Sequence, residues 1–209
     1  MNLKTILYQN YNSHLSDCIG IYDDVISKEK CNEIIEFTNS SLQIRVADHR
    51  KQSREVQLIG DPRPEARLLS TELLETIYPY GDKFERSLWD KCHEDYKPED
   101  YTLTESYKTN FSSLQIQKYT PEDKGYPAVH VEQGGDKSLI RRYLAVILYL
   151  NDIEEGGETI FPMCGTSVEP VAARLAIWPT GIPFYQCGLP TVKQDKYIIT
   201  SWFEFLLGL

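Results

Sequence analysis

The chain has 209 residues, a net charge of −9 and a hydrophobic content of 41%. It is long enough to bury one substantial core, and the acidic balance argues against a nucleic-acid partner held mainly by phosphate contacts. No apolar run approaches the length of a membrane span or a secretory signal, so we expect a soluble, cytoplasmic protein without a membrane partner. Five scattered cysteines with no CxxC pair support neither a disulfide framework nor a zinc–cysteine site.

The first part of the chain carries helical patterns. Ser27 can cap a helix whose apolar positions Cys31, Ile34 and Ile35 follow a helical spacing. A second apolar pattern with helical spacing follows the "DPRP" motif; Pro79 is expected to end it, and a third helix follows. We therefore expect residues 1–112 to form a helical N-terminal support region.

The pattern changes to strands from residue 113 onward. In "LQIQKY", Leu114 and Ile116 fall on one face, and Gln115, Gln117 and Tyr119 fall on the other. The run "YLAVILYL" predicts a strand covered on both faces. Short strands separated by Gly, Pro and Asp turn signals indicate a double-stranded β-helix, or jelly roll, over 113–209. The expected fold is mainly β with N-terminal helices (α+β), in a single domain over 1–209.

One pair of side chains suggests metal chemistry. His130 and Glu132 lie two residues apart, so on an extended strand both point to the same face. An imidazole and a carboxylate side by side form part of a facial metal site. An isolated HxE is more often a surface pair on a strand, but this one lies eleven residues after Tyr119 and just ahead of the "YLAVILYLND" strand. That position strengthens the metal-site interpretation.

A longer series of motifs resembles a known family. The segments "YLND", "EGGET" with its following Phe, and the late "KY…W" occur in the order typical of Fe(II)/2-oxoglutarate-dependent dioxygenases, specifically the prolyl 4-hydroxylase-like group. The resemblance spans Ser113 to Phe205. It implies decarboxylation of 2-oxoglutarate coupled to hydroxylation of a prolyl or other peptidyl side chain, with Fe(II) and 2-oxoglutarate as cofactors and ascorbate as a further candidate. The partner would be a peptide or protein substrate; the oligomeric state is left open.

The resemblance also assigns site residues. His130 matches the first iron ligand, and Glu132 stands at the carboxylate position, where most relatives have Asp. Lys196 matches the basic residue that pairs with the distal carboxylate of 2-oxoglutarate. Ten residues before it, where relatives have the second histidine ligand, this chain has Gln186, and no histidine follows His130. The implied metal ligands are therefore His130, Glu132 and Gln186, the last a weaker, neutral amide donor.

Other positions have both a functional and a structural interpretation. Tyr119 and Thr159 match residues that contact 2-oxoglutarate in relatives, but each could instead only pack in its strand. Lys196 alone would usually be a solvated lysine at the start of a strand. Trp202 is expected to be a core residue. Arg142 could line a substrate entrance, although a solvated loop is the commoner setting.

Two functions follow, from different classes. The first is an active dioxygenase, favoured by the HxE pair and by Lys196, because an abandoned site has no chemical reason to keep a buried cation. The second is a catalytically inactive jelly-roll protein that serves as a binding or assembly module, favoured by Gln186. Both readings predict that His130, Glu132, Gln186 and Lys196 converge inside one end of the jelly roll.

Overall fold

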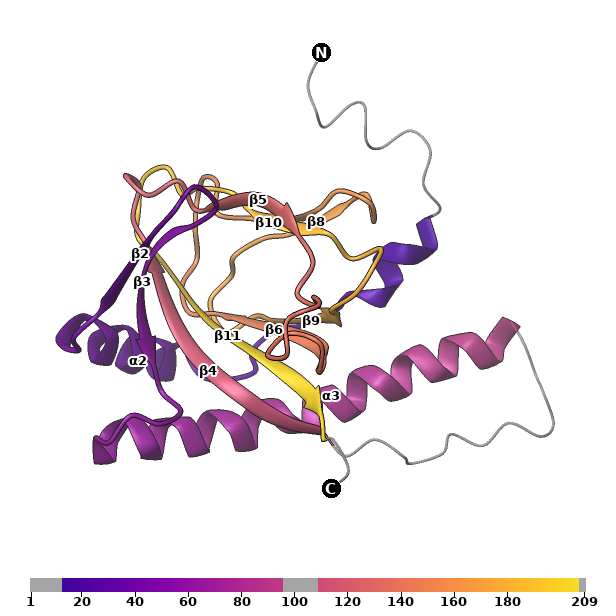
Figure 1. Cartoon of the computed structure of the whole chain (residues 1–209), viewed down its shortest axis with the longest axis horizontal. Coiled ribbons are helices and arrows are strands. Elements are labelled where there is room, and N and C mark those ends of the chain that lie inside the picture. Colours follow the sequence, from indigo (N-terminus) through magenta and orange to yellow (C-terminus); the bar gives the residue numbers. More distant parts are fainter. Residues whose placement is uncertain (1–12, 96–108, 207–209) are drawn as a thin grey trace, which may run out of the picture.

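The computed structural model describes residues 13–95 and 109–206 of the chain. Two helices, α2 (Lys28–Ser40) and α3 (Pro64–Asp95), follow a short 3₁₀ turn, η1 (Ser13–Cys18). Ser27 caps α2 as expected: its side chain accepts a hydrogen bond from the backbone N–H of Lys30. In Figure 1 both helices lie below the larger sheet, which separates them from the smaller one.

The strands form two antiparallel sheets. The larger sheet has the order β1-β9-β6-β11-β4-β3-β2, and the smaller has the order β5-β10-β7-β8. The strands of the larger sheet, in chain order, are β1 (Gly20–Tyr22), β2 (Ile44–Ala47), β3 (Gln52–Gln57), β4 (Thr109–Tyr119), β6 (Arg142–Tyr149), β9 (Leu175–Pro179) and β11 (Lys196–Phe205). Those of the smaller sheet are β5 (Tyr126–His130), β7 (Thr159–Phe161), β8 (Thr166–Val168) and β10 (Gln186–Gly188).

The apolar run in β6 explains why the two layers hold together. Leu144, Val146 and Leu148 pack with the helices in one buried cluster. Ala145 and Ile147 belong to a second cluster, between the two sheets. Because successive side chains of a strand point to opposite faces, a strand covered on both sides must be apolar throughout. The predicted two-sided burial of this strand is confirmed.

Two expectations about the first 112 residues differ from the structure. Pro79 does not end a helix but lies inside α3, and the expected third helix is the continuation of the second. The buried residues Ile77 and Phe84 stand on either side of the proline, so apolar packing against the sheet outweighs the roughly 3 kcal/mol that an interior proline costs a helix. The region is also not purely helical, because β1, β2 and β3 extend the larger sheet. Among the described residues, no helix is both long and apolar enough to cross a membrane.

Candidate active site

One cavity between the two sheets contains all six residues that the sequence singled out. Five strands and one loop supply them: Tyr119 from β4, His130 from β5, Glu132 from the residues after β5, Thr159 from β7, Gln186 from β10 and Lys196 from β11. The sheet pairings explain part of this convergence: the Cα atoms of His130 and Gln186 are direct partners across β5 and β10, and those of Lys196 and Tyr119 are partners across β11 and β4. The predicted convergence of His130, Glu132, Gln186 and Lys196 is confirmed.

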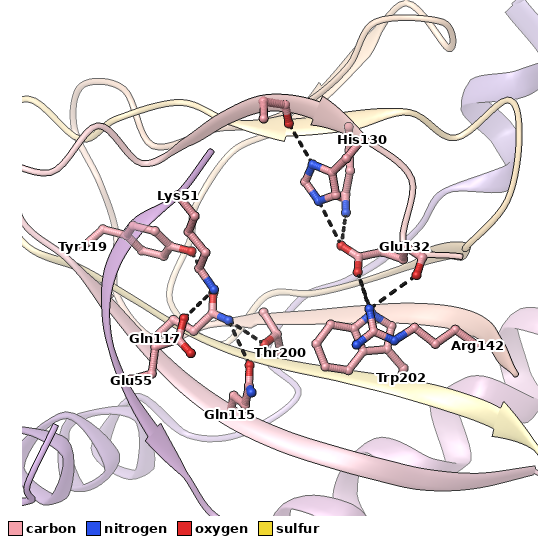
Figure 2. Close-up of polar contacts among 12 residues, drawn as sticks. Lys51, Glu55, Gln115, Gln117, Tyr119, His130, Glu132, Arg142, Thr200 and Trp202 are labelled. Carbon is pink, nitrogen blue, oxygen red and sulfur yellow. Dashed lines mark hydrogen bonds and ion pairs between the residues drawn. The ribbon is translucent and has the colours of Figure 1, made fainter. Parts of the chain in front are cut away.

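His130 presents one ring nitrogen to the cavity. Its Nδ1 lies 2.7 Å from the carbonyl oxygen of Ala128, which can only accept, so Nδ1 carries the proton. In the neutral ring Nε2 then keeps its lone pair, and this nitrogen lies 3.2 Å from Oε1 of Glu132 (Figure 2). Tyr126 stacks on the imidazole with 4.0 Å between the ring centroids, which further fixes the orientation of the ring. A hydrogen bond that sets the tautomer in this way is typical of metal-binding histidines.

The carboxylate of Glu132 has hydrogen-bond donors at both oxygens. Oε2 accepts from Nη1 of Arg142 and from Nε1 of Trp202, each at 2.9 Å. The Arg142 guanidinium also lies 3.6 Å from the centre of the Trp202 ring, so these two side chains hold each other in place (Figure 2). Burial alone would raise the pKa of Glu132, but the neighbouring side chains, with Arg142 and Trp202 as donors to Oε2, hold the pKa below its ordinary value. Glu132 is therefore ionised and fixed.

Gln186 is buried beside this carboxylate. Its Nε2 donates to Oε1 of Glu132 at 2.5 Å, and its own Oε1 is a buried atom to which no described residue donates a hydrogen bond. An unpartnered buried carbonyl oxygen is costly, which makes this atom a candidate for binding a ligand. Gln186, which was identified by its position ten residues before Lys196, therefore lies in the site.

Lys196 is a buried cation elsewhere in the same cavity. The residue is 4% exposed, and its Nζ donates to the carbonyl oxygen of Gly157 at 2.8 Å. Burial lowers the pKa of Lys196 to about 8, against the opposing effect of the Glu158 charge. Within the described part of the chain, Lys196 forms no ion pair. Gly157 has a positive φ of 78°, and a Cβ there would lie 3.2 Å from Cδ of Lys196, so this glycine of "EGGET" both makes the turn and leaves room for the lysine.

Tyr119 and Thr159 line the cavity, but their hydroxyls already have partners in the chain. Tyr119 donates to Oε1 of Gln117 at 2.7 Å, and Thr159 shares a 2.7 Å hydrogen bond with the hydroxyl of Tyr149. Lys196 Nζ lies 5.0 Å from the centre of the Tyr119 ring. Both residues are thus placed at the site, and a ligand that accepts a hydrogen bond from the Tyr119 hydroxyl has to displace the one to Gln117.

Three residues of the site were not assigned a specific role there by sequence reasoning. Arg142 lies in β6 and not in a solvated loop, and Trp202 faces the cavity as well as the core. Gln117 was placed only on the polar face of its strand. For Trp202 the available signal was strand alternation. Lys196 and Trp202 lie six positions apart along β11, so both side chains face the same side of the sheet.

The donor set fits a divalent cation with two strong ligands and one weak one. Two donors at about 2.1 Å from one octahedral ion lie about 3 Å apart, close to the 3.2 Å between His130 Nε2 and Glu132 Oε1. Rotation of the Gln186 amide would offer its oxygen as the third ligand. Among the described residues, no group of three or more His, Cys, Asp or Glu side chains could hold a metal, so a third strong ligand is not supplied there.

Comparisons with known proteins agree with this geometry. Residues 114–204 match the family model of the 2OG-Fe(II) oxygenase superfamily. A Pseudomonas putida prolyl-4-hydroxylase has a TM-score of 0.64 at 15% identity, covering 99% of this chain and 100% of that chain. A viral collagen prolyl hydroxylase from Paramecium bursaria chlorella virus 1, in its 2OG complex, has a TM-score of 0.59 at 20% identity, covering 91% and 97%. A comparison with curated proteins gave no match.

The structural neighbours share the fold, and the family match covers the strands that carry the site. Lys196, Gln186, His130 and Glu132 all lie within the matched residues. Residues 114–204, somewhat under half of the chain, match the 2OG-Fe(II) oxygenase superfamily, and the chain has a fold like that of the prolyl 4-hydroxylases.

Proposed function

We propose that the protein is a 2-oxoglutarate-dependent oxygenase with an altered metal site. One observation carries the proposal: a single cavity combines a buried ammonium at Lys196, which forms no ion pair with any described residue, with two lone-pair donors 3.2 Å apart, at His130 and Glu132. A dicarboxylate fits this arrangement, with one carboxylate at Lys196 and its other end towards the metal ligands.

The residues have separate roles in this proposal. Lys196 neutralises the distal carboxylate, while His130 and Glu132 hold the metal and Gln186 completes the set through its amide oxygen. Arg142 and Trp202 fix Glu132 through Oε2, which leaves Oε1 directed at His130. Bound Fe(II), together with 2-oxoglutarate and O₂, supplies the oxidising power for hydroxylating a C–H bond. By analogy with the two structural neighbours, the substrate class is a prolyl or other peptidyl side chain.

The test is a comparison of the wild type with Gln186→His. Imidazole is a stronger donor than an amide oxygen for a late first-row divalent ion, so the variant should bind Fe(II) more tightly, by at least about tenfold, or 1.4 kcal/mol. An anaerobic Fe(II) titration measures the affinity. Succinate formation in air, with ascorbate and a proline-containing peptide present, measures turnover. Unchanged metal affinity would show that the Gln186 side chain is not at a ligand position.

A second candidate function is metal-independent ligand binding. The favouring observation is that Glu132 is already charge-balanced by Arg142 and hydrogen-bonded at both oxygens. Calorimetry of 2-oxoglutarate binding in the presence of a chelator separates the two functions. Tight binding in chelator without succinate formation in either protein would favour the binding module.

A further inference from the structure

Gln117 is the centre of a hydrogen-bond network on the cavity wall. Its Oε1 accepts from the hydroxyl of Tyr119 at 2.7 Å, while its Nε2 donates to Oγ1 of Thr200 at 3.1 Å and to Oε1 of Gln115 at 3.3 Å. Figure 2 shows the Gln117 amide between these three partners. Gln117 is 4% exposed, and both ends of its amide are used, so the three contacts together fix the orientation of the amide.

This network determines what Tyr119 can offer to a ligand. A phenol has a single hydrogen, and here that hydrogen is donated to Gln117. The Lys196 ammonium lies 5.0 Å from the centre of the same ring, so a carboxylate paired with Lys196 becomes a neighbour of Tyr119. With its hydrogen committed, the Tyr119 oxygen presents only lone pairs to that carboxylate, which is an unfavourable contact.

We propose that Gln117 limits the affinity of the cavity for dicarboxylates by withholding the Tyr119 hydroxyl from the carboxylate at Lys196. The proposal rests on the proposed function in assuming that Lys196 binds a carboxylate. To gain the hydroxyl, the ligand must break the Tyr119–Gln117 hydrogen bond, and an exchange of one buried hydrogen bond for another yields little net free energy. The site then binds its dicarboxylate less tightly than Lys196 and Tyr119 acting together would allow.

Gln117 also determines the hydrogen bonding of Thr200 and Gln115 on the same cavity wall. Because Thr200 and Gln115 accept from Gln117, each keeps its own hydrogens available for other partners. If a ligand takes the Tyr119 hydroxyl, Gln117 loses its donor and its amide is freed to reorient against Thr200 and Gln115. Gln117 is therefore a positioning residue: it acts through Tyr119 and is not required to touch the ligand.

The experiment is a double-mutant cycle that combines Gln117→Leu and Tyr119→Phe, read out as the dissociation constant for 2-oxoglutarate by calorimetry. Leucine removes the acceptor of the Tyr119 hydroxyl and leaves that buried donor to the ligand. Gln117→Leu should therefore bind 2-oxoglutarate about tenfold more tightly than the wild type. Tyr119→Phe should change the affinity by less than about threefold in the wild-type background, but should weaken binding about tenfold in the Gln117→Leu background.

Matched controls exclude general effects on the fold. Gln43→Leu makes the same chemical change at the end of α2, where the Gln43 amide donates to the carbonyl oxygen of Thr38, and it should leave the affinity unchanged. Thermal melts of all four proteins of the cycle verify that each is folded. The cycle is run both with a chelator and with Mn(II), so that the readout does not depend on turnover.

Two outcomes would overturn the inference in distinguishable ways. If Tyr119→Phe costs the same in both backgrounds, or if Gln117→Leu weakens binding, then Gln117 withholds nothing and only this inference fails. If none of the four folded proteins binds 2-oxoglutarate, the proposed function fails and the inference fails with it. Binding by Gln117→Leu but not by the wild type would support both.

Discussion

The cavity contains two buried charged side chains, Lys196 and Glu132, which differ in whether the described residues supply a countercharge. We call Lys196, Tyr119 and Gln117 the lysine region. Here the described residues form no ion pair with the Lys196 ammonium. We call Glu132 and its neighbours His130, Gln186, Arg142 and Trp202 the carboxylate region. Here Arg142 supplies the countercharge to Glu132, and the other three residues each make one further contact with the carboxylate. The lysine region needs an anion to balance it, whereas the carboxylate region is balanced by the protein itself.

The pKa shifts follow the same division. Lys196 is buried and forms no ion pair within the described residues, so desolvation outweighs the Glu158 charge and lowers the pKa of Lys196 to about 8. Desolvation also acts on Glu132, but there the contacts with neighbouring side chains, Arg142 and Trp202 among them, overcome it and the pKa falls below its ordinary value. Burial thus destabilises the charged form of Lys196, whereas the contacts around Glu132 keep its charged form stable despite burial. Lys196 is therefore the charged group of the cavity that an anionic ligand would stabilise most.

The largest expected effect tests whether the carboxylate region is balanced by Arg142. Arg142→Met keeps the length of the side chain but leaves Glu132 without its countercharge. Removing one partner of a buried ion pair costs about 3–5 kcal/mol, and because these side chains are 17% and 14% exposed we expect a loss near 3 kcal/mol in the free energy of unfolding. Chemical denaturation measures it.

The double variant Arg142→Met/Glu132→Leu is the control for this loss. It removes both charges and should recover most of the stability, because a buried pair replaced by apolar side chains is often neutral. Mn(II) should also stabilise Arg142→Met more than the wild type, since a bound cation replaces the missing charge. Wild-type stability in the single variant would mean that Glu132 does not depend on Arg142.

The next effect concerns ligand binding in the lysine region. Lys196→Met removes the ammonium and keeps an unbranched chain of similar length. The loss of a charge-assisted hydrogen bond, worth about 1.5–3 kcal/mol, should weaken 2-oxoglutarate binding by about ten- to a hundredfold. Lys193→Met is the control, because Lys193 pairs on the surface with Glu155. Equal affinities for the wild type and Lys196→Met would remove Lys196 from the ligand site.

The strands were more predictable from sequence than the long helix. In β4, alternation placed Leu114 and Ile116 on one face and Gln117 on the other, and the structure has the first two in the core and Gln117 at the cavity. Strict alternation follows from local backbone geometry alone. Pro79 misled the helix prediction because the rule for proline is local, while the packing that keeps α3 intact involves residues distant in sequence.

The residues of the site also fall into those that the sequence could identify and those that it could not. His130 and Glu132 could be identified by their spacing, and Lys196 with Gln186 by a resemblance in which the distance along the chain is informative. Arg142 and the commitment of the Tyr119 hydroxyl to Gln117 could not be predicted. Those two features depend on side-chain hydrogen bonds between strands, and the choice among competing partners is decided only when the strands are assembled.

The smallest effect is the pH dependence of the lysine region, and it provides the most specific test of the comparison. The folded-state pKa of Lys196, about 8, lies below its ordinary value of 10.5. Between these values the unfolded chain binds more protons than the folded one, so Lys196 should make stability rise with pH by up to about 1.4 kcal/mol per unit. Binding should change in the opposite direction. Above pH 8 the ligand-free lysine loses its proton, and 2-oxoglutarate affinity should fall by up to about tenfold per pH unit.

Lys196→Arg separates this effect from other titrations in the cavity. A guanidinium stays protonated throughout this range, so the variant should bind 2-oxoglutarate with a flat profile from pH 7 to 9.5, while the wild type declines. Lys196→Met should show neither the rise in stability nor the decline in affinity. A wild-type affinity that stays constant to pH 9.5 would mean that the cation holding the ligand is one that does not titrate, and Arg142 would then replace Lys196 as the candidate.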